Sequence, residues 1–247
     1  MSIPAEQVTL PERGWQIDPR HALIAAACCW AGFAVVVLLM LGGKIEDIDK
    51  AGLMFWRQAG GLVPIGPAWL LEAVRDVTAL GGVFLRNLFA IAAIAALLFL
   101  RLRREAVLFA ATVVTAWGVN TGIKLLVGRE RPTIVEHLTE AGGHSFPSGH
   151  SFNSAVVYIA MALAFAAISP RRSVRWTVIV CAMAATILIA ISRVWLGVHF
   201  PSDVAAGWLG GAGWAFLASA VLYRPARELA DETASYSPTG GGGSPQG

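Results

Sequence analysis

Long apolar runs separated by short charged connectors dominate the chain between residues 22 and 223. A bilayer core about 30 Å thick is crossed by about 20 apolar helical residues. Six runs approach that length, and we interpret each as a membrane-spanning helix. They are Ala22–Leu41, Val83–Leu100, Ala106–Val127, Ser151–Ser169, Trp176–Ser192 and Val204–Tyr223. The pattern predicts an all-α fold, a polytopic membrane protein built on a six-transmembrane-helix bundle.

The first run also has the length of a signal peptide. No small-residue cleavage site follows it, and the next residues are Gly42-Gly43-Lys44, so we favour a retained anchor. We therefore expect three parts: an N-terminal segment 1–21, a six-span domain 22–223 and a tail 224–247. The tail is rich in Ser, Gly and Pro, which is typical of disorder.

The segment 44–80 between the first two spans has a different pattern. Polar or small residues recur at 72, 75, 76 and 79, while Leu70, Val74 and Val77 lie on the opposite helical face. This spacing predicts an amphipathic helix lying in the membrane interface. A seventh span is the alternative, but the charges and the prolines Pro64 and Pro67 argue against it.

Composition supports lipid as the solvent. Charged residues make up only 14% of the chain, against about 25% in a typical soluble domain. The net charge of +3 comes from basic residues placed between apolar runs, which forms no stripe for nucleic acid. The three cysteines lie inside apolar runs without metal-ligand spacing, and we interpret them as apolar fillers.

Basic residues in short connectors predict the orientation. The connectors Arg101–Glu105 and Pro170–Arg175 are rich in arginine, which places them in the cytoplasm together with both chain ends. Counting crossings from there puts three polar clusters on the opposite, extracytoplasmic side. These clusters read KLLVGRERP from Lys124 to Pro132, SFPSGH from Ser145 to His150, and SRVWLGVHFPSD from Ser192 to Asp203.

The clusters suit a phosphate or similar anion. Cations and helix N-termini bind anions, and charge near a bilayer tends to mark function. Ser148 and Gly149 precede a predicted helix, where a hydroxyl and free backbone N–H groups face a ligand. Asp203 follows His199 by one helical turn, so the carboxylate can hold one imidazole nitrogen and leave the other free.

Simpler roles exist for single members of these clusters. Alone, Lys124 could extend its amine to the interface, Arg131 and Arg193 could anchor headgroups, and Asp203 could cap a helix. The remaining charged loop residues are interpreted as solvated: Arg129, Glu130, Glu136, His137, Glu140 and His144. Two of them are histidines, but no further ligand spacing supports a metal site.

Taken together, the three motifs resemble those of the type 2 phosphatidic acid phosphatase family. They are Lys124 to Arg131-Pro132, then Pro147-Ser148-Gly149-His150, then Ser192-Arg193 to His199 and Asp203. All are complete, in order and between the expected spans. The resemblance covers roughly Leu80 to Tyr223.

The resemblance implies a six-span helical membrane core whose site is shared with soluble vanadium-dependent haloperoxidases. It implies that His199 is the nucleophile that forms a phosphohistidine, and that Asp203 orients it. It further implies that His150 protonates the leaving oxygen and then activates water. Groups that would bind the phosphoryl oxygens are Lys124, Arg131, Arg193, Ser148 and the Gly149 N–H. The family implies no cofactor and no metal, and three fixed cations can neutralise the charge that Mg²⁺ neutralises elsewhere.

We therefore expect a lipid phosphate phosphatase of a bacterial inner membrane with its site facing the periplasm. Its partners would be membrane lipids and a lipid phosphate such as undecaprenyl pyrophosphate, phosphatidylglycerol phosphate, phosphatidic acid or lipid A 1-phosphate. A phosphotransferase with the same intermediate remains open. An anion transporter fits less well, because few polar residues lie deep in the spans and inverted repeats are absent from the sequence.

The orientation predicts a labelling pattern. Single cysteines at Thr139 and Ser173, in a variant without Cys28, Cys29 and Cys181, would lie on opposite sides of the membrane. A membrane-impermeant maleimide added to intact spheroplasts should label position 139 and spare position 173. The reverse pattern would contradict the topology.

Overall fold

The computed structural model describes residues 18–58, 63–169 and 171–235, and its regular elements there are all helices. They are α1 (Pro19–Leu41), α2 (Glu46–Met54), α3 (Ala68–Leu80), α4 (Val83–Phe99), α5 (Arg103–Val127), α6 (Gly149–Ile168), α7 (Arg172–Trp195) and α8 (Pro201–Ser235). An isolated antiparallel bridge joins Arg57 to Pro64. The predicted all-α class is confirmed.

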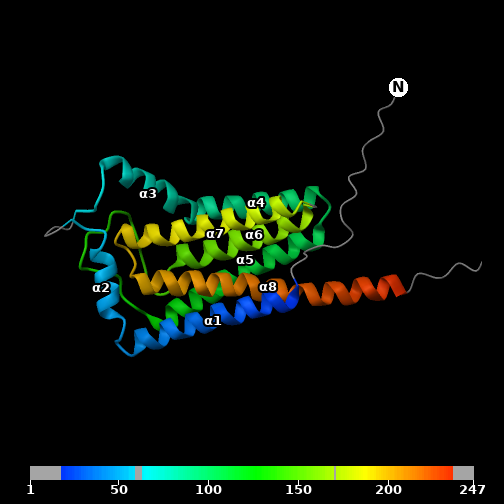
Figure 1. Cartoon of the computed structure of the whole chain (residues 1–247), viewed down its shortest axis with the longest axis horizontal. Helices are drawn as coiled ribbons and strands as arrows, with labels where there is room; N and C mark the ends of the chain where they lie inside the picture. Colours follow the sequence, from blue (N-terminus) through cyan, green and yellow to red (C-terminus); the bar gives the residue numbers. More distant parts are fainter. Residues whose placement is uncertain (1–17, 59–62, 170, 236–247) are drawn as a thin grey trace, which may run out of the picture.

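Helices α1 and α4 to α8 run lengthwise as a bundle, while α2 lies across one end and α3 lies at the same end, tilted relative to the bundle (Figure 1). Helix α6 is the most enclosed of the six. From Phe152 to Ala160 every one of its residues is buried, because α5, α7 and α8 pack around it. The side chains of Ala155, Tyr158 and Leu163 join α4, α5, α7 and α8 in one apolar core.

Large apolar side chains also cover the outside of the bundle. Exposed examples are Leu38 on α1, Phe99 on α4, Leu126 on α5 and Leu188 on α7. A soluble monomer rarely exposes apolar surface on this scale, whereas a bilayer provides an apolar solvent for it. The outer surface therefore agrees with the lipid contact that the composition predicts.

Among the residues that the structure describes, fewer helices than the sequence predicts are long and apolar enough to span a membrane. By length and composition, α1, α5, α6 and α7 are long and apolar enough, and α3 with α4 forms a fifth candidate if the pair is one span bent by 46°. Helix α4 alone is shorter because Gly81 and Gly82 separate it from α3. The number of six spans stays a prediction.

The segment expected in the interface contains α2 and α3. On α3 the residues 72, 75, 76 and 79 are all exposed, whereas Leu70, Val74 and Val77 are half-buried against the bundle. The two faces of α3 thus follow the predicted helical spacing. Its position in a membrane interface stays a prediction.

The ends of the chain differ from expectation in one respect. Helix α8 continues through 224–235, within the segment predicted to be a disordered tail. Ala, Arg, Glu and Leu are strong helix formers and are frequent there, which accounts for the difference. The glycine run Gly240–Gly243 and the first residues of the N-terminal segment lie outside the described residues.

Close packing of α6 on α8 depends on small residues of α8. A Cβ added at Gly211 would collide with the Phe152 carbonyl oxygen, and one at Gly207 would lie 2.7 Å from the Ser148 oxygen. These two glycines are four residues apart, the spacing that lets membrane helices approach closely. The contact fixes the start of α6 beside the start of α8, where the polar clusters lie.

Candidate active site

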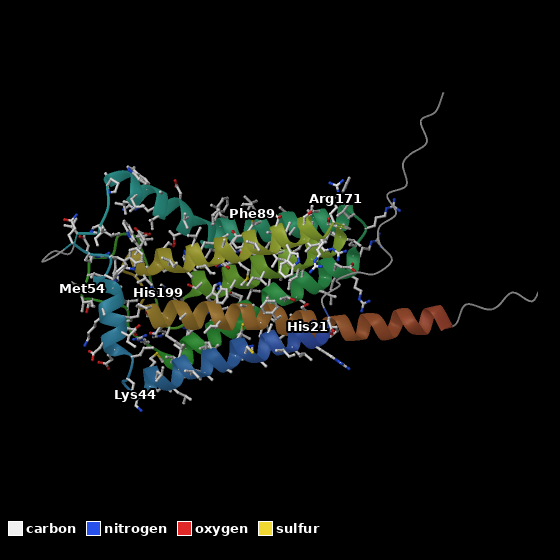
Figure 2. All side chains as sticks on the ribbon, in the orientation of Figure 1. His21, Lys44, Met54, Phe89, Arg171 and His199 are labelled. Carbon is white, nitrogen blue, oxygen red and sulfur yellow. The ribbon has the colours of Figure 1, made fainter. Side chains whose placement is uncertain are left out.

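The three sequence clusters meet at one end of the bundle. Figure 2 places His199 at the same end as Lys44 and Met54, whereas Arg171 lies at the other end. The contributing segments are the C-terminus of α5 with the loop 128–148, the first turn of α6, and the turn from α7 into α8. The sequence-based grouping on one membrane face therefore agrees with the fold.

His199 lies on the turn between α7 and α8. The chain reverses at Gly197, whose φ of +77° and closeness to the Glu136 oxygen leave no room for a side chain. The His199 ring is only 2% exposed. Its Nδ1 lies 3.2 Å from Ser145 Oγ and 3.5 Å from Asp203 Oδ2. Its Nε2 lies 3.1 Å from Arg131 Nη1, so one nitrogen is held by polar partners and the other faces a cation.

Asp203 lies in the first turn of α8, where its carboxylate has two functions. Oδ2 accepts a hydrogen bond of 2.9 Å from the Phe200 N–H, which caps the helix, and another from Ser145 Oγ. The same oxygen faces His199 Nδ1. The capping contact that the sequence offered for Asp203 is thus present, and the orientation of the imidazole by the same carboxylate stays a prediction. The backbone oxygen of Asp203 also accepts from the Ser148 N–H at 2.9 Å, which joins α8 to α6.

Two predicted phosphate ligands are held by uncharged oxygens of the loop. Lys124 Nζ donates to the His144 carbonyl at 2.7 Å. Arg131 donates to the carbonyls of Gly142, Gly143 and Val198 at 2.7–3.0 Å. Burial lowers the pKa of Arg131, although Asp203 nearby raises it. These partners fix both cations without cancelling their charge.

The third cation, Arg193, comes from the last turn of α7. Its side chain is 3% exposed and donates from Nη1 to Thr78 Oγ1 at 2.9 Å. Its Nε has no partner among the described residues. A buried guanidinium N–H without an acceptor is costly, so this atom is available for an anion.

The first turn of α6 supplies the remaining predicted groups. Ser148 is the N-cap, and its Oγ accepts from the Ser151 N–H at 3.4 Å. A Cβ at Gly149 would lie 3.6 Å from Lys124 Cε, so the glycine backbone faces this lysine. His150 follows, half-buried against Gly81 at the α3–α4 turn. Its ring makes no hydrogen bond to another described residue, and its proton-transfer role stays a prediction.

Arg129 corrects the sequence-based interpretation. It was predicted to be solvated, but its side chain is 18% exposed and bridges two carboxylates, with 2.7 Å to Asp203 Oδ1 and 2.7 Å to Asp49 Oδ2. Burial would lower the pKa of Arg129, but the two carboxylates raise it above its ordinary value. Ser145 was part of a motif without a role. Asp49 belongs to a segment without a motif, and no local sequence signal points to it.

Metal binding has little support in the donor set. Across the described ranges no group of three or more His, Cys, Asp and Glu side chains could hold a metal ion. His137, one of the two loop histidines considered for a metal, lies with Nε2 2.7 Å from the Pro132 carbonyl oxygen. His144 is exposed.

Comparison with known proteins identifies a family and several relatives that the chain resembles. The model of the PAP2 superfamily matches residues 105–227. The chain is 35% identical over 165 residues to phosphatidylglycerophosphatase B of Bacillus subtilis, covering 66% of this chain and 75% of that protein. It is 34% identical over 182 residues to decaprenylphosphoryl-5-phosphoribose phosphatase of Mycobacterium tuberculosis, covering 71% of this chain and 84% of the relative.

A solved structure is similar over most of its length. It is the crystal structure of a transmembrane PAP2 type phosphatidylglycerolphosphate phosphatase from Bacillus subtilis. The TM-score is 0.67 at 27% sequence identity, and the match covers 83% of this chain and 96% of that one. These matches confirm the resemblance predicted from the three motifs and support an integral membrane protein with phosphatase relatives.

The surroundings of His199 predict its protonation state. Burial lowers the pKa of His199 to about 4, against a partly compensating effect of Asp203. Because a histidine is uncharged above its pKa, the ring should stay neutral at pH 5.5, where an ordinary imidazole with a pKa of about 6.5 is mostly charged. Nitrogen NMR of histidine-labelled protein, with His199→Gln to assign the signal, would measure this. A charged ring at pH 5.5 would contradict the geometry.

Proposed function

Because the chain belongs to the PAP2 superfamily, we propose that it is a lipid phosphate phosphatase in which His199 forms a phosphohistidine. The observation that carries this proposal is the two-sided environment of His199. Nδ1 meets Ser145 and Asp203, and Nε2 faces Arg131 within 3.1 Å. This arrangement favours the tautomer with hydrogen on Nδ1 and a lone pair on Nε2, which is the form that attacks phosphorus.

In the first step, Nε2 of His199 attacks phosphorus and the bond to the lipid oxygen breaks. Arg131, Arg193 and Lys124 take up the charge on the phosphoryl oxygens, together with the N-terminus of α6. Carbonyl groups already hold Lys124 and Arg131 in place, so little reorganisation accompanies binding. His150 transfers its proton to the leaving oxygen, and the lipid alcohol, or the lipid monophosphate when a diphosphate is cleaved, departs.

In the second step, water replaces the lipid. His150, now neutral, removes a proton from the water as its oxygen attacks phosphorus, and the bond to Nε2 breaks. Inorganic phosphate leaves, His150 is again protonated, and His199 returns to its starting form. Asp203 and Ser145 hold Nδ1–H throughout, because phosphorylation of Nε2 places positive charge on the ring.

A lipid tail has an apolar route to this site. A cavity of about 470 Å³ lies between α4, α5 and α6, where Ile94, Val113 and Trp117 contribute to an apolar wall. Asn153 also lines it, one helical turn from Gly149, whose carbonyl accepts from Asn153 Nδ2 at 3.0 Å. A substrate would enter sideways from the bilayer, with its phosphate at the bundle end.

The substrate class follows from this entry and the proposed orientation. With Arg101–Glu105 and Pro170–Arg175 in the cytoplasm, the site faces the periplasm of a bacterial inner membrane. It would meet lipids of the outer leaflet, such as undecaprenyl pyrophosphate or phosphatidylglycerol phosphate. Two relatives act, by name, on a glycerophospholipid and on a prenyl-linked phosphate, so both kinds belong in the substrate panel.

Replacing the nucleophile tests the proposed mechanism. His199→Ala should reduce release of inorganic phosphate from every lipid in the panel by on the order of 10⁴-fold or more, because the covalent step is lost. His21→Ala is the matched control, since His21 is an exposed histidine at the other end of the bundle. Near-normal phosphate release by folded His199→Ala protein in detergent would show that this histidine is not the nucleophile.

The cation set predicts the response to two reagents. Activity should survive EDTA, because Lys124, Arg131 and Arg193 supply the positive charge at the phosphoryl group. Vanadate should inhibit, because it adopts the five-coordinate geometry of the transition state. Phosphate release measured with each reagent, and after adding Mg²⁺ to the EDTA sample, would check both. Loss with EDTA and recovery with Mg²⁺ would refute metal-independent catalysis.

A further inference from the structure

The Asp203 carboxylate has a second side that the proposed mechanism does not use. Oδ2 faces His199, Ser145 and the Phe200 N–H, whereas Oδ1 accepts from Arg129 Nη1 at 2.7 Å. The Arg129 guanidinium also lies over the Phe200 ring, 4.3 Å from its centroid. A charged group therefore touches the carboxylate directly behind the proposed nucleophile.

Arg129 is shared with a second buried carboxylate, that of Asp49 on α2. Arg129 Nη2 donates to Asp49 Oδ2 at 2.7 Å, and Asp49 is 1% exposed. Asp49 also accepts from the Ser202 N–H at 2.9 Å and from Ser202 Oγ at 2.6 Å. These bonds join α2 to the first turn of α8, next to Asp203, and fill both oxygens of Asp49.

The net charge of Asp49, Arg129 and Asp203 determines how strongly this group attracts a positively charged His199 ring. Alone beside Asp203, Arg129 would neutralise the carboxylate and weaken its attraction for a positively charged imidazole ring. Asp49 is a second anion on the other arm of the same guanidinium, so the group of three carries one net negative charge. In a buried site, where screening is weak, that negative charge favours the positive ring of the phosphohistidine.

We propose that Asp49 and Arg129 are positioning residues that act through Asp203. Arg129 fixes the carboxylate so that Oδ2 faces His199, and Asp49 keeps the net charge behind His199 negative. Neither side chain is among the groups proposed to bind the phosphate. Arginine suits the bridge because its planar fork presents two different nitrogens, Nη1 to Asp203 and Nη2 to Asp49, whereas a lysine ammonium has a single nitrogen. The inference rests on the proposed role of His199.

Asp49→Asn is the first test. It removes one charge with little change in shape. We expect kcat to fall about 10- to 100-fold, by analogy with the loss seen when residues that orient metal-binding histidines are replaced. KM and inhibition by inorganic phosphate should change little, because Lys124, Arg131 and Arg193 are untouched. Glu46→Gln is the matched control on α2, where an exposed carboxylate lies 3.9 Å from Lys50, and it should keep wild-type kinetics.

A double-mutant cycle measures the coupling between Asp49 and Arg129. Arg129→Gln leaves Asp49 and Asp203 buried without their shared cation, and its kcat should fall more than that of Asp49→Asn, because Oδ2 of Asp203 is no longer fixed toward His199. Asp49→Asn combined with Arg129→Gln leaves Asp203 as the one anion of the group, so kcat should recover to above that of Arg129→Gln alone. Additive losses in the cycle would refute the proposal.

A conservative variant serves as the control for an effect on folding. Arg129→Lys keeps a positive charge against the carboxylates, so melting in detergent should stay close to wild type while kcat falls, because the fork is lost. If Asp49→Asn and Arg129→Lys both keep wild-type kcat while His199→Ala is inactive, the positioning role is wrong and the proposed function stands. If His199→Ala is active, the proposed function itself fails.

Discussion

A carboxylate removed from water needs donors for its lone pairs, and Asp203 is fully buried at the first turn of α8. Its donors come from separate parts of the chain. Ser145 and Arg129 reach it from the loop between α5 and α6, and the Phe200 N–H and His199 approach from the α7–α8 turn. The loop between α5 and α6 is held to this one side chain, because moving the loop away would remove two donors of the carboxylate, Arg129 and Ser145.

The same requirement extends to α2 and α6. Arg129 brings a positive charge into a buried place, and Asp49 compensates it from α2, which holds that helix across the end of the bundle. The Asp203 backbone oxygen accepts from the Ser148 N–H, and Gly207 lets the two helix starts approach. The first turn of α6, with the proposed anion-binding groups, is thereby fixed beside His199.

Much of this arrangement follows from the sequence, but not all of it. Apolar runs and helical spacing predicted the helices and both faces of α3, because burial depends on local periodicity. Counting membrane crossings predicted that the three motifs lie on one side, because successive loops alternate between the two sides of a membrane. The motif residues are Lys124, Arg131, Arg193, His150 and His199. The partners of Arg129 were not predictable, since Asp49 and Asp203 lie 80 and 74 positions away and pairing at such distances depends on tertiary packing.

The number of spans was also beyond local pattern. The apolar run from Val83 to Leu100 forms α4, which meets α3 at an angle of 46° across Gly81-Gly82. Whether such a pair counts as one span depends on how it meets the bilayer, which hydropathy alone does not determine. The glycines that mark the bend were visible in the sequence, but the close approach of Gly81 to Ile189 and His150 was not.

Arg129 and Arg131 show how chemical role is decided by partners rather than by position. Both arginines lie at the start of the loop 128–148, and both are half-buried. The partners of Arg129 include two carboxylates, which compensate its charge, so it serves the fold and the orientation of Asp203. Arg131 meets carbonyl oxygens and the uncharged His199 ring, which hold it but leave its charge uncompensated. In the proposed mechanism an anionic substrate is therefore drawn to Arg131, and its phosphoryl group arrives where Nε2 of His199 can reach it.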